Sequence, residues 1–555
     1  MRALNPVIRG FAPDPTIVRA GDAYYLATSS FEWFPTIPVY RSTDLVHWEH
    51  VGAVDSAVPG RSLLGVPDSG GIWAPAMSHA DGVFWMVYSI VRSVGRRFYD
   101  LETYLTLADD PAGPWAEPVR LPGHGFDPAL FHHEGRHYLL NLQNDSRVGG
   151  RRFDGIVLTE LDVPIVDGAA HLGQVRPVGS THLLLQREEL VEGPKITAHD
   201  GWFYLLLAQG GTGVEHGVLV ARSRSVTGPY EVDEQVLLTS RDDPDQPLQK
   251  AGHGELVQTP GGQWFLTHLA SRPLQTAAGP RNPLGRETAI QPIVFTDGWP
   301  RLAHGGWHPA TVVQAPTGAP APENPAATPA PAAADTTTTG WPWSTLREPV
   351  GDWADTGARP GWLRLRGRMG PESLWQQSLL AQRMLEHHAE VSVLLEAEPT
   401  TFTQSAGLVL WYNATSYYQL HLTWAEPDGQ PQQGQQWQGR GRRVLVLDHG
   451  HPEGARRLAR QEVPHGPVRL SATITGATAQ LFWSPASAGA ATGEPAPVGG
   501  VLDMTELSDD FGPTLRFTGA FVGLSAVDLV EGRWHADFTD WQLRFFSSSG
   551  QRVPR

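Results

Sequence analysis

The sequence predicts an all-β protein with two domains, a five-bladed β-propeller followed by a β-sandwich. Three observations lead to this prediction. Short aromatic strands recur five times in about the first 300 residues, each behind a tight turn. No stretch between them shows the apolar period of an amphipathic helix, which a doubly wound α/β fold would need. A segment rich in Pro, Ala and Thr then precedes a second half with alternating strands.

The five aromatic strands are regularly spaced. They begin at Ala23, Val83, His137, Trp202 and Gln263, behind the turns Gly21-Asp22, Asp81-Gly82, Glu134-Gly135, Asp200-Gly201 and Gly261-Gly262. Gly and Asp favour the positive φ angles of tight hairpins. The central aromatics Tyr25, Trp85, Tyr138, Tyr204 and Phe265 are 60, 53, 66 and 61 residues apart. Repeats of this length that hold several strands are typical of propeller blades.

The strand before each aromatic strand should be the innermost of its blade. Eleven residues before the central aromatics stand Asp14, Ala74, Asp127, Gly193 and Gly254, and Pro follows the first four. One residue earlier, the second, fourth and fifth repeats carry Trp73, Glu192 and His253. This register predicts a ring of three carboxylates, one imidazole and one indole around the propeller axis.

Three carboxylates at matched positions of a closed repeat indicate catalysis. Buried acidic groups are unfavourable unless they are paired or used. Several together move one another's pKa values apart, as acid–base chemistry requires. A single Asp-Pro is more often a turn, so the agreement in register is what favours a catalytic role for Asp14, Asp127 and Glu192.

Composition narrows the classes of partner. The chain has 555 residues and a formal net charge of −16, with no Lys/Arg run, which argues against nucleic acid. It has no cysteine, which excludes disulfides, zinc–thiolate sites and a cysteine nucleophile. The N-terminus shows no signal-peptide core and the chain no apolar run of transmembrane length, so we expect a cytoplasmic protein without membrane contact.

The predicted domains are 1–314 and 341–550, joined by a linker at 315–340. The linker has too few large apolar residues to fold, and its prolines keep it extended. In the second domain, Ala406–Tyr412 and Tyr417–Leu422 predict one hairpin, and Val468–Ile474 and Ala479–Trp483 another. These hairpins favour a β-sandwich.

Six motifs in chain order carry a family resemblance. They are FAPDPTIVR (Phe11–Arg19), GIWAPAM (Gly71–Met77), GFDPALF (Gly125–Phe131), EGPKI (Glu192–Ile196), AGHGELV (Ala251–Val257) and PLGRETAIQP (Pro283–Pro292). As an ordered set they resemble glycoside hydrolase family 43, and more closely its two-domain β-xylosidases. The resemblance covers most of the chain and implies that the second domain is a concanavalin A-like β-sandwich.

The resemblance implies a separate role for each carboxylate. Asp14 matches the general base that activates water, and Glu192 matches the general acid that protonates the leaving oxygen. Asp127 matches a third acid that tunes the pKa of Glu192 and orients it. An inverting glycosidase holds its acid and base about 6.5–9.5 Å apart to leave room for a water, which suits carboxylates on different blades.

The resemblance also implies the residues that bind substrate. His253 and Arg286 match groups that bind the non-reducing-end sugar, and Phe31 and Trp73 match the aromatic walls of the first subsite. From the second domain Phe517, in preference to Phe511, matches a phenylalanine that closes the site. No cofactor is expected to be required. A divalent ion such as calcium occurs near the channel histidine of some family members, but His253 alone does not predict one.

The expected function is that of an inverting, exo-acting β-xylosidase that releases D-xylose from short xylo-oligosaccharides. The nearest alternative is an α-L-arabinofuranosidase, or an enzyme with both activities, because the two sugars present similar hydroxyls. A retaining fructoside hydrolase and a non-catalytic sugar-binding propeller are more distant alternatives. The expected partner is a small oligosaccharide, and the sequence leaves homo-oligomerisation open.

Overall fold

The computed structural model describes residues 2–553 apart from 55–61, 167–168, 171, 318–338, 426–440, 488–489, 492 and 514–515. The chain divides into one unit of Met1–Pro273 with Arg286–Glu323, and a second of Leu274–Gly285 with Asn324–Arg555. Most of the predicted linker, 315–340, lies outside the described residues. Residues 274–285, which the sequence places in the first domain, group with the second unit, where the carbonyl of Pro283 accepts from the N–H of Ala520 at 2.7 Å.

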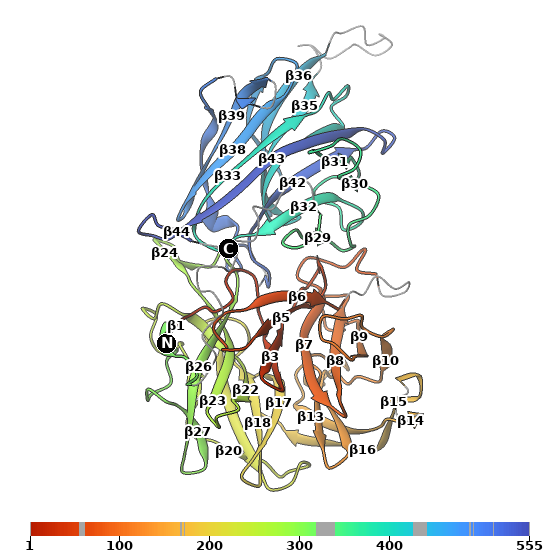
Figure 1. Cartoon of the computed structure of the whole chain (residues 1–555), viewed down its shortest axis with the longest axis vertical. Coiled ribbons are helices and arrows are strands. Elements are labelled where there is room, and N and C mark those ends of the chain that lie inside the picture. Colours follow the sequence, from red (N-terminus) through yellow and green to blue (C-terminus); the bar gives the residue numbers. More distant parts are fainter. Residues whose placement is uncertain are drawn as a thin grey trace. The chain divides into compact units, whose positions relative to one another are not determined.

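The first unit contains five antiparallel sheets, each with a path of four strands, which form the blades of a propeller (Figure 1). Blade I is β2 (Thr16–Ala20), β3 (Ala23–Ala27), β5 (Pro38–Ser42) and β6 (Glu49–Ala53). Blade II is β7 (Gly71–Ala80), β8 (Val83–Val91), β9 (Leu101–Ala108) and β10 (Val119–Leu121). Blade III is β11 (Ala129–His133), β12 (Arg136–Leu142), β13 (Ile156–Asp162) and β16 (Arg176–Leu185). Blade IV is β17 (Val191–His199), β18 (Trp202–Gln209), β19 (Gly217–Ser223) and β20 (Glu231–Val232), with β21 (Leu238–Thr239) also on β19. Blade V is β22 (Gln249–Gln258), β23 (Trp264–Ser271), β26 (Glu287–Thr296) and β27 (Trp299–Leu302).

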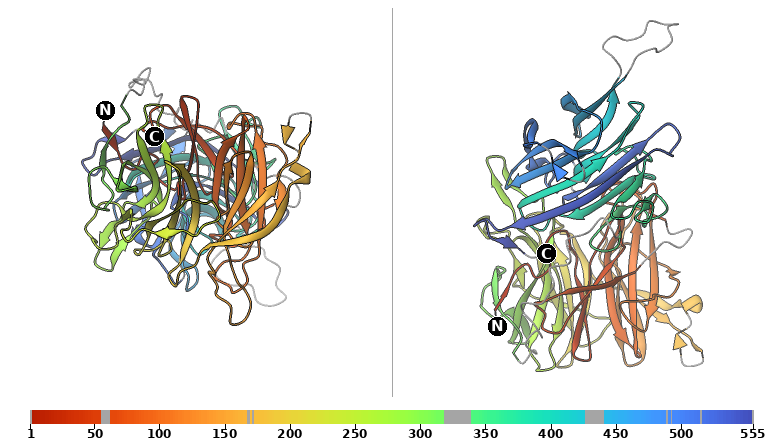
Figure 2. Two further views of the ribbon diagram at one scale, coloured as in Figure 1. Left: turned by 90° about the horizontal axis from the view of Figure 1, so that it is seen from below. Right: turned by 45° about the horizontal axis from the view of Figure 1, so that its top comes forward.

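The first strand of each blade lies innermost, as predicted. Strand β2 lies beside β7 and β22, β7 beside β11, β11 beside β17, and β17 beside β22, so the inner strands close into a ring. The left view of Figure 2 shows the blades from below, arranged around a common centre. Strand β1 (Arg2–Leu4) pairs with β28 (Val312–Gln314), which joins the beginning of the unit to its last strand.

The hairpins have the turn chemistry that the sequence predicts. Asp81, Glu134 and Asp200, each followed by Gly, have φ angles of 55°, 51° and 49°. The aromatics behind these turns anchor the blades, since Trp85 and Tyr204 are each 1% exposed. Burying side chains of this size contributes about 1.5–3 kcal/mol each.

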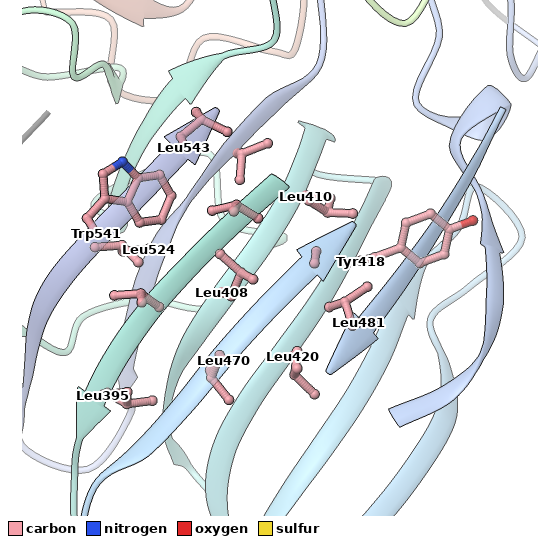
Figure 3. Close-up of a cluster of buried hydrophobic side chains, with 14 of the residues drawn as sticks. Leu395, Leu408, Leu410, Tyr418, Leu420, Leu470, Leu481, Leu524, Trp541 and Leu543 are labelled. Atoms are coloured by element: carbon pink, nitrogen blue, oxygen red, sulfur yellow. The ribbon is translucent and has the colours of Figure 1, made fainter. Parts of the chain in front are cut away.

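The second unit is a sandwich of two antiparallel sheets. One follows the order β32 (Ser378–Arg383), β42 (Phe521–Asp528), β34 (Gln404–Asn413), β35 (Ser416–Ala425), β36 (Arg442–Gly450) and β37 (Arg456–Glu462). The other runs β30 (Ala354–Asp355), β31 (Leu363–Arg366), β43 (His535–Phe546), β33 (His388–Glu396), β38 (Val468–Thr475), β39 (Thr478–Ser487) and β40 (Ala490–Ala491), with β41 (Ala496–Asp503) on β39 and β44 (Arg552–Val553) on β43. Leucines such as Leu408 and Leu470 point from opposite sheets into one core (Figure 3).

The predicted fold class is confirmed. The described residues contain strands and only two short 3-10 helices, η1 (Leu172–Gln174) and η2 (Met504–Glu506). Within that part of the chain, no helix has the length and apolar character needed to cross a membrane.

Candidate active site

The predicted ring residues lie where the pairing of each inner strand begins or is interrupted. One extra residue breaks the pairing between Trp73 and Ala76 in β7, between Glu192 and Lys195 in β17, and between Gly252 and Glu255 in β22. In blades I and III, pairing starts directly after Asp-Pro. Such bulges re-aim side chains, and they accept Pro because no ladder N–H is needed there.

The structure corrects the predicted position of His253. The ring residues Asp14, Asp127, Gly193 and His253 have φ angles of 53°, 50°, 58° and 46°. The sequence register placed His253 one step before this position. It was wrong because Phe265 pairs eight residues back, whereas the other four central aromatics pair seven back. His253 is therefore equivalent to Asp14 and Asp127, and Asp and His adopt this conformation more readily than most residues.

Asp14 is a buried carboxylate held by three partners. One oxygen, Oδ1, accepts from a guanidinium N–H of Arg286 at 2.8 Å and lies 3.7 Å from Nδ1 of His253. The other accepts from the hydroxyl of Ser29 at 2.6 Å. Burial by itself would raise the pKa of Asp14, but Arg286, His253 and Ser29 bring that pKa below its ordinary value. Asp14 therefore stays ionised, as a general base must.

Asp127 and Glu192 show the opposite behaviour. Oδ2 of Asp127 accepts from the N–H of Gly193 at 3.0 Å, which ties blade III to the residue after Glu192. Burial and the charge of Asp14 raise the pKa of Asp127 to about 7. Burial, Asp127 and Asp14 raise the pKa of Glu192 well above its ordinary value. Burial and these charges favour the protonated carboxyl of Glu192, while the residue as a whole is partly exposed.

His253 is a buried, neutral imidazole. It is 4% exposed, and burial lowers its pKa to about 4. Its ring fills the space beside Gly193, where a Cβ would lie 2.8 Å from Cε1 of His253.

A divalent ion would need several oxygen ligands. Across the described residues no three His, Asp or Glu side chains gather to hold a metal, and the positive charges of Lys195 and Arg286 lower the pKa of His253. These side chains do not fit a protein-built divalent site.

Phe31 and Trp73 form one aromatic wall. Their ring centroids are 6.3 Å apart, and the guanidinium of Arg286 lies 5.7 Å from the centre of the Phe31 ring. The backbone of Phe31 bonds to that of Ile72, which joins blades I and II at this wall. This contact requires glycine at Gly71, where a Cβ would lie 2.2 Å from the carbonyl oxygen of Phe31.

The structure adds residues that the sequence did not indicate. Phe11 lies 6.0 Å from Phe31, Phe126 lies 5.3 Å from Trp73 and Tyr99 lies 6.0 Å from Trp73, all between ring centroids. Ser29, two residues after the end of β3, donates to Asp14. His216 is 1% exposed and contributes to the low pKa of Asp14. Phe11 and Phe126 lie in the same motifs as Asp14 and Asp127, which is the one signal that could have found them.

The remaining predicted site residue lies in the second unit. Phe517 is half-buried there. Its alternative, Phe511, contacts the ring of His451 at 5.6 Å within the same unit. The predicted role of Phe517 in closing the site stays a prediction.

The propeller thus brings together a carboxylate that stays ionised, a carboxyl that stays protonated, and aromatic surface that suits the apolar face of a sugar ring. An acid and a base in contrasting environments are the groups that glycoside hydrolysis requires. The charge of Asp127 raises the pKa of Glu192 and so helps to separate the pKa values of the acid and the base.

Comparison with known proteins agrees with this chemistry. Residues 3–300 match the model of glycosyl hydrolases family 43, and residues 335–544 match the beta xylosidase C-terminal concanavalin A-like domain. The "Xylan 1,3-beta-xylosidase" of a Vibrio species is 36% identical over 96% of this chain and 97% of its own length. The "Xylosidase/arabinosidase 43B" of Humicola insolens is 36% identical over 95% of this chain and 94% of its own.

A solved structure extends the match to the fold. The crystal structure of xylan beta-1,4-xylosidase from Bacillus halodurans C-125 superposes with a TM-score of 0.88 at 38% identity, covering 98% of this chain and 99% of that one. The family model covers more than half of the chain, and the relatives match along nearly all of it. The protein is therefore a glycoside hydrolase that belongs to family 43.

Proposed function

We propose that this enzyme is an inverting, exo-acting β-xylosidase that releases D-xylose from the non-reducing ends of short xylo-oligosaccharides. The observation that carries the mechanism is the opposite tuning of two carboxyl groups on blades I and IV. Arg286 and Ser29 hold Asp14 ionised, whereas burial and the charges of Asp127 and Asp14 hold Glu192 protonated. The choice of sugar rests on the relatives, whose names give xylosidase activity.

In the proposed reaction Glu192 gives its proton to the glycosidic oxygen as the bond to the anomeric carbon breaks. Asp14 takes a proton from a water, whose oxygen forms the new bond on the opposite face of the sugar. Glu192 ends ionised and Asp14 protonated, and exchange with solvent restores both. Displacement by water in one step inverts the anomeric centre, so a β-xyloside gives α-xylose first.

An end-on mode of binding suits the groups around Asp14. Arg286 and His253 are 3% and 4% exposed, so the site ends in buried polar groups beside the base. A terminal sugar can place its hydroxyls against such a floor, whereas an internal sugar would have to continue through it. We assign the first subsite to Arg286, His253, Phe31 and Trp73, which contact one another or Asp14.

Rates on paired aryl glycosides test the sugar. We expect kcat/KM on 4-nitrophenyl β-D-xylopyranoside to exceed that on 4-nitrophenyl α-L-arabinofuranoside by at least about tenfold. Equal rates would favour a bifunctional enzyme, the second candidate, which the name of the Humicola insolens relative supports. Faster arabinoside cleavage would overturn the proposal. Parallel assays on β-1,4- and β-1,3-linked xylobiose would assign the linkage, since the relatives' names include both.

The pKa shifts predict how activity depends on pH. The pKa of Asp14 is lowered, so the acidic limb of kcat/KM should lie below the ordinary range of an aspartate. The pKa of Glu192 is raised, so the alkaline limb should lie well above that of an ordinary glutamate. Asp127→Asn removes one charge that raises the pKa of Glu192, and the alkaline limb should move to lower pH. An unmoved or raised limb in this variant would contradict the role of Asp127.

A further inference from the structure

A second polar layer lies directly behind the ring of catalytic residues. This layer contains the residue two positions after the ring position in each inner strand. These residues are Thr16, Ala76, Ala129, Lys195 and Glu255, and each lies two positions before the residue that pairs with the central aromatic of its blade. Lys195 and Glu255 carry opposite charges, and their side chains are only 6% and 17% exposed. Buried charges of this kind are costly without partners.

Hydrogen bonds from three blades fix this pair. Oε2 of Glu255 accepts from the hydroxyl of Thr16 at 2.8 Å and from the N–H of Ile17 at 2.9 Å. The ammonium of Lys195 lies 3.7 Å from the same oxygen and donates to the hydroxyl oxygen of Thr16 at 3.4 Å. That hydroxyl oxygen also accepts from the N–H of Met77 at 3.0 Å. The positive charge of Lys195 is therefore held in one place below the ring.

Lys195 lies on the same strand as Glu192, one layer below the ring. Along β17 it comes two residues after Gly193, whose N–H binds Asp127. The charge of Asp14 raises the pKa of Asp127, the charges of Lys195 and Arg286 lower it, and the charge of Asp127 raises the pKa of Glu192. Arg286 is already engaged with Asp14 at 2.8 Å.

We propose that Lys195 is a positioning residue whose fixed charge keeps Asp127 ionised and so keeps the shared proton on Glu192. Asp127 and Glu192 together hold one proton in two arrangements, and only the one with the proton on Glu192 can protonate a leaving group. The charge of Lys195 lowers the pKa of Asp127, which burial and Asp14 raise, and the charge of Asp127 in turn raises the pKa of Glu192. A cation that favours an ionised Asp127 therefore favours the active arrangement. This inference rests on the proposed function of Glu192 as the acid.

Leaving-group dependence tests this role. A 2,4-dinitrophenol leaves without protonation, whereas the sugar that leaves xylobiose needs a proton from the acid. We expect Lys195→Met to lower kcat on xylobiose by about two- to fivefold, because one pKa unit of bias changes the ratio of the two proton arrangements tenfold but lowers the fraction with the proton on Glu192 by less. The rate on 2,4-dinitrophenyl β-xyloside should change little. Glu255→Gln keeps the cation and serves as the matched control. It should retain a wild-type ratio of the two rates even if its melting temperature falls.

A double variant distinguishes the proposed role from a loss of stability caused by an unpaired buried charge. Lys195→Met leaves Glu255 buried without its cation, but Lys195→Met with Glu255→Gln removes both charges and should show the same selective loss on xylobiose. Equal losses on both substrates, or the same pattern in Glu255→Gln, would show a structural ion pair and overturn the proposal. The variant Glu192→Gln distinguishes a wrong assignment of the acid from a wrong role for Lys195. If it also lacks leaving-group dependence, the acid assignment itself fails, whereas dependence in Glu192→Gln but not in Lys195→Met rejects only the role of Lys195.

Discussion

Glu192→Gln is expected to lower kcat on xylobiose by about 10³-fold, since general acid catalysis contributes about 10²–10⁴-fold. Glutamine matches the shape of glutamic acid and cannot give a proton to the leaving oxygen. Burial and two nearby carboxylates raise the pKa of Glu192 well above its ordinary value, which favours the protonated form that the reaction needs. Xylose release measured by chromatography, with melting temperatures for both proteins, would check the loss at equal stability.

The pH profile gives the control for Glu192. In Glu192→Gln the alkaline limb of kcat/KM should disappear, because the group that titrates there is gone, while the acidic limb set by Asp14 remains. A variant that kept xylobiose turnover within a few fold of wild type, or kept its alkaline limb, would show that another residue is the acid.

Asp14→Asn is expected to lower kcat by about 10³-fold on every substrate, whatever its leaving group. The base acts on the water, so an easily departing phenol does not remove the need for it. Arg286 and Ser29 now donate to the two different oxygens of Asp14, at 2.8 and 2.6 Å. The amide oxygen of Asn can still accept from Arg286, and its NH2 can donate to the hydroxyl oxygen of Ser29, so the site should keep its shape. Initial rates on xylobiose and 2,4-dinitrophenyl β-xyloside would measure the loss.

Two further variants test the role of Asp14 as the general base. Asp14→Ala should lose as much activity as Asp14→Asn, and also stability, because it leaves the buried Arg286 without this partner. Ser29→Ala removes one hydrogen bond and keeps the carboxylate, so it should lower the rate much less and move the acidic limb to higher pH. Near wild-type turnover in both Asp14 variants would exclude this residue as the base.

The sequence predicts the propeller well because its signals are local. Turn residues such as Asp81 and Asp200 sit beside the strands they connect, and their left-handed φ angles follow from the pairs Asp-Gly. The register of the ring came from counting along single hairpins, which works only while every hairpin has the same length. Blade V breaks that rule by one residue, so His253 was misplaced by one position although its presence at the ring was predicted.

The parts of the site that could not be predicted depend on contacts between distant segments. Arg286 reaches Asp14 from 272 positions away, and only the family resemblance indicated it. Ser29 and His216 carry no local pattern that marks them as neighbours of Asp14. Lys195 and Glu255 lie in motifs that were identified, but their pairing appears only when β17 and β22 face the same channel. Phe517 belongs to a different unit from the acids, and its role stays a prediction.

The stereochemistry of the first product tests the central claim most directly. Proton NMR during hydrolysis of β-1,4-xylobiose by the wild-type enzyme separates the two anomers of xylose before mutarotation mixes them. With Asp14 as the base and Glu192 as the acid, α-xylose should appear first from the cleaved sugar and β-xylose only later. β-Xylose as the first product would mean a covalent intermediate and a nucleophilic carboxylate, and it would contradict the assigned mechanism.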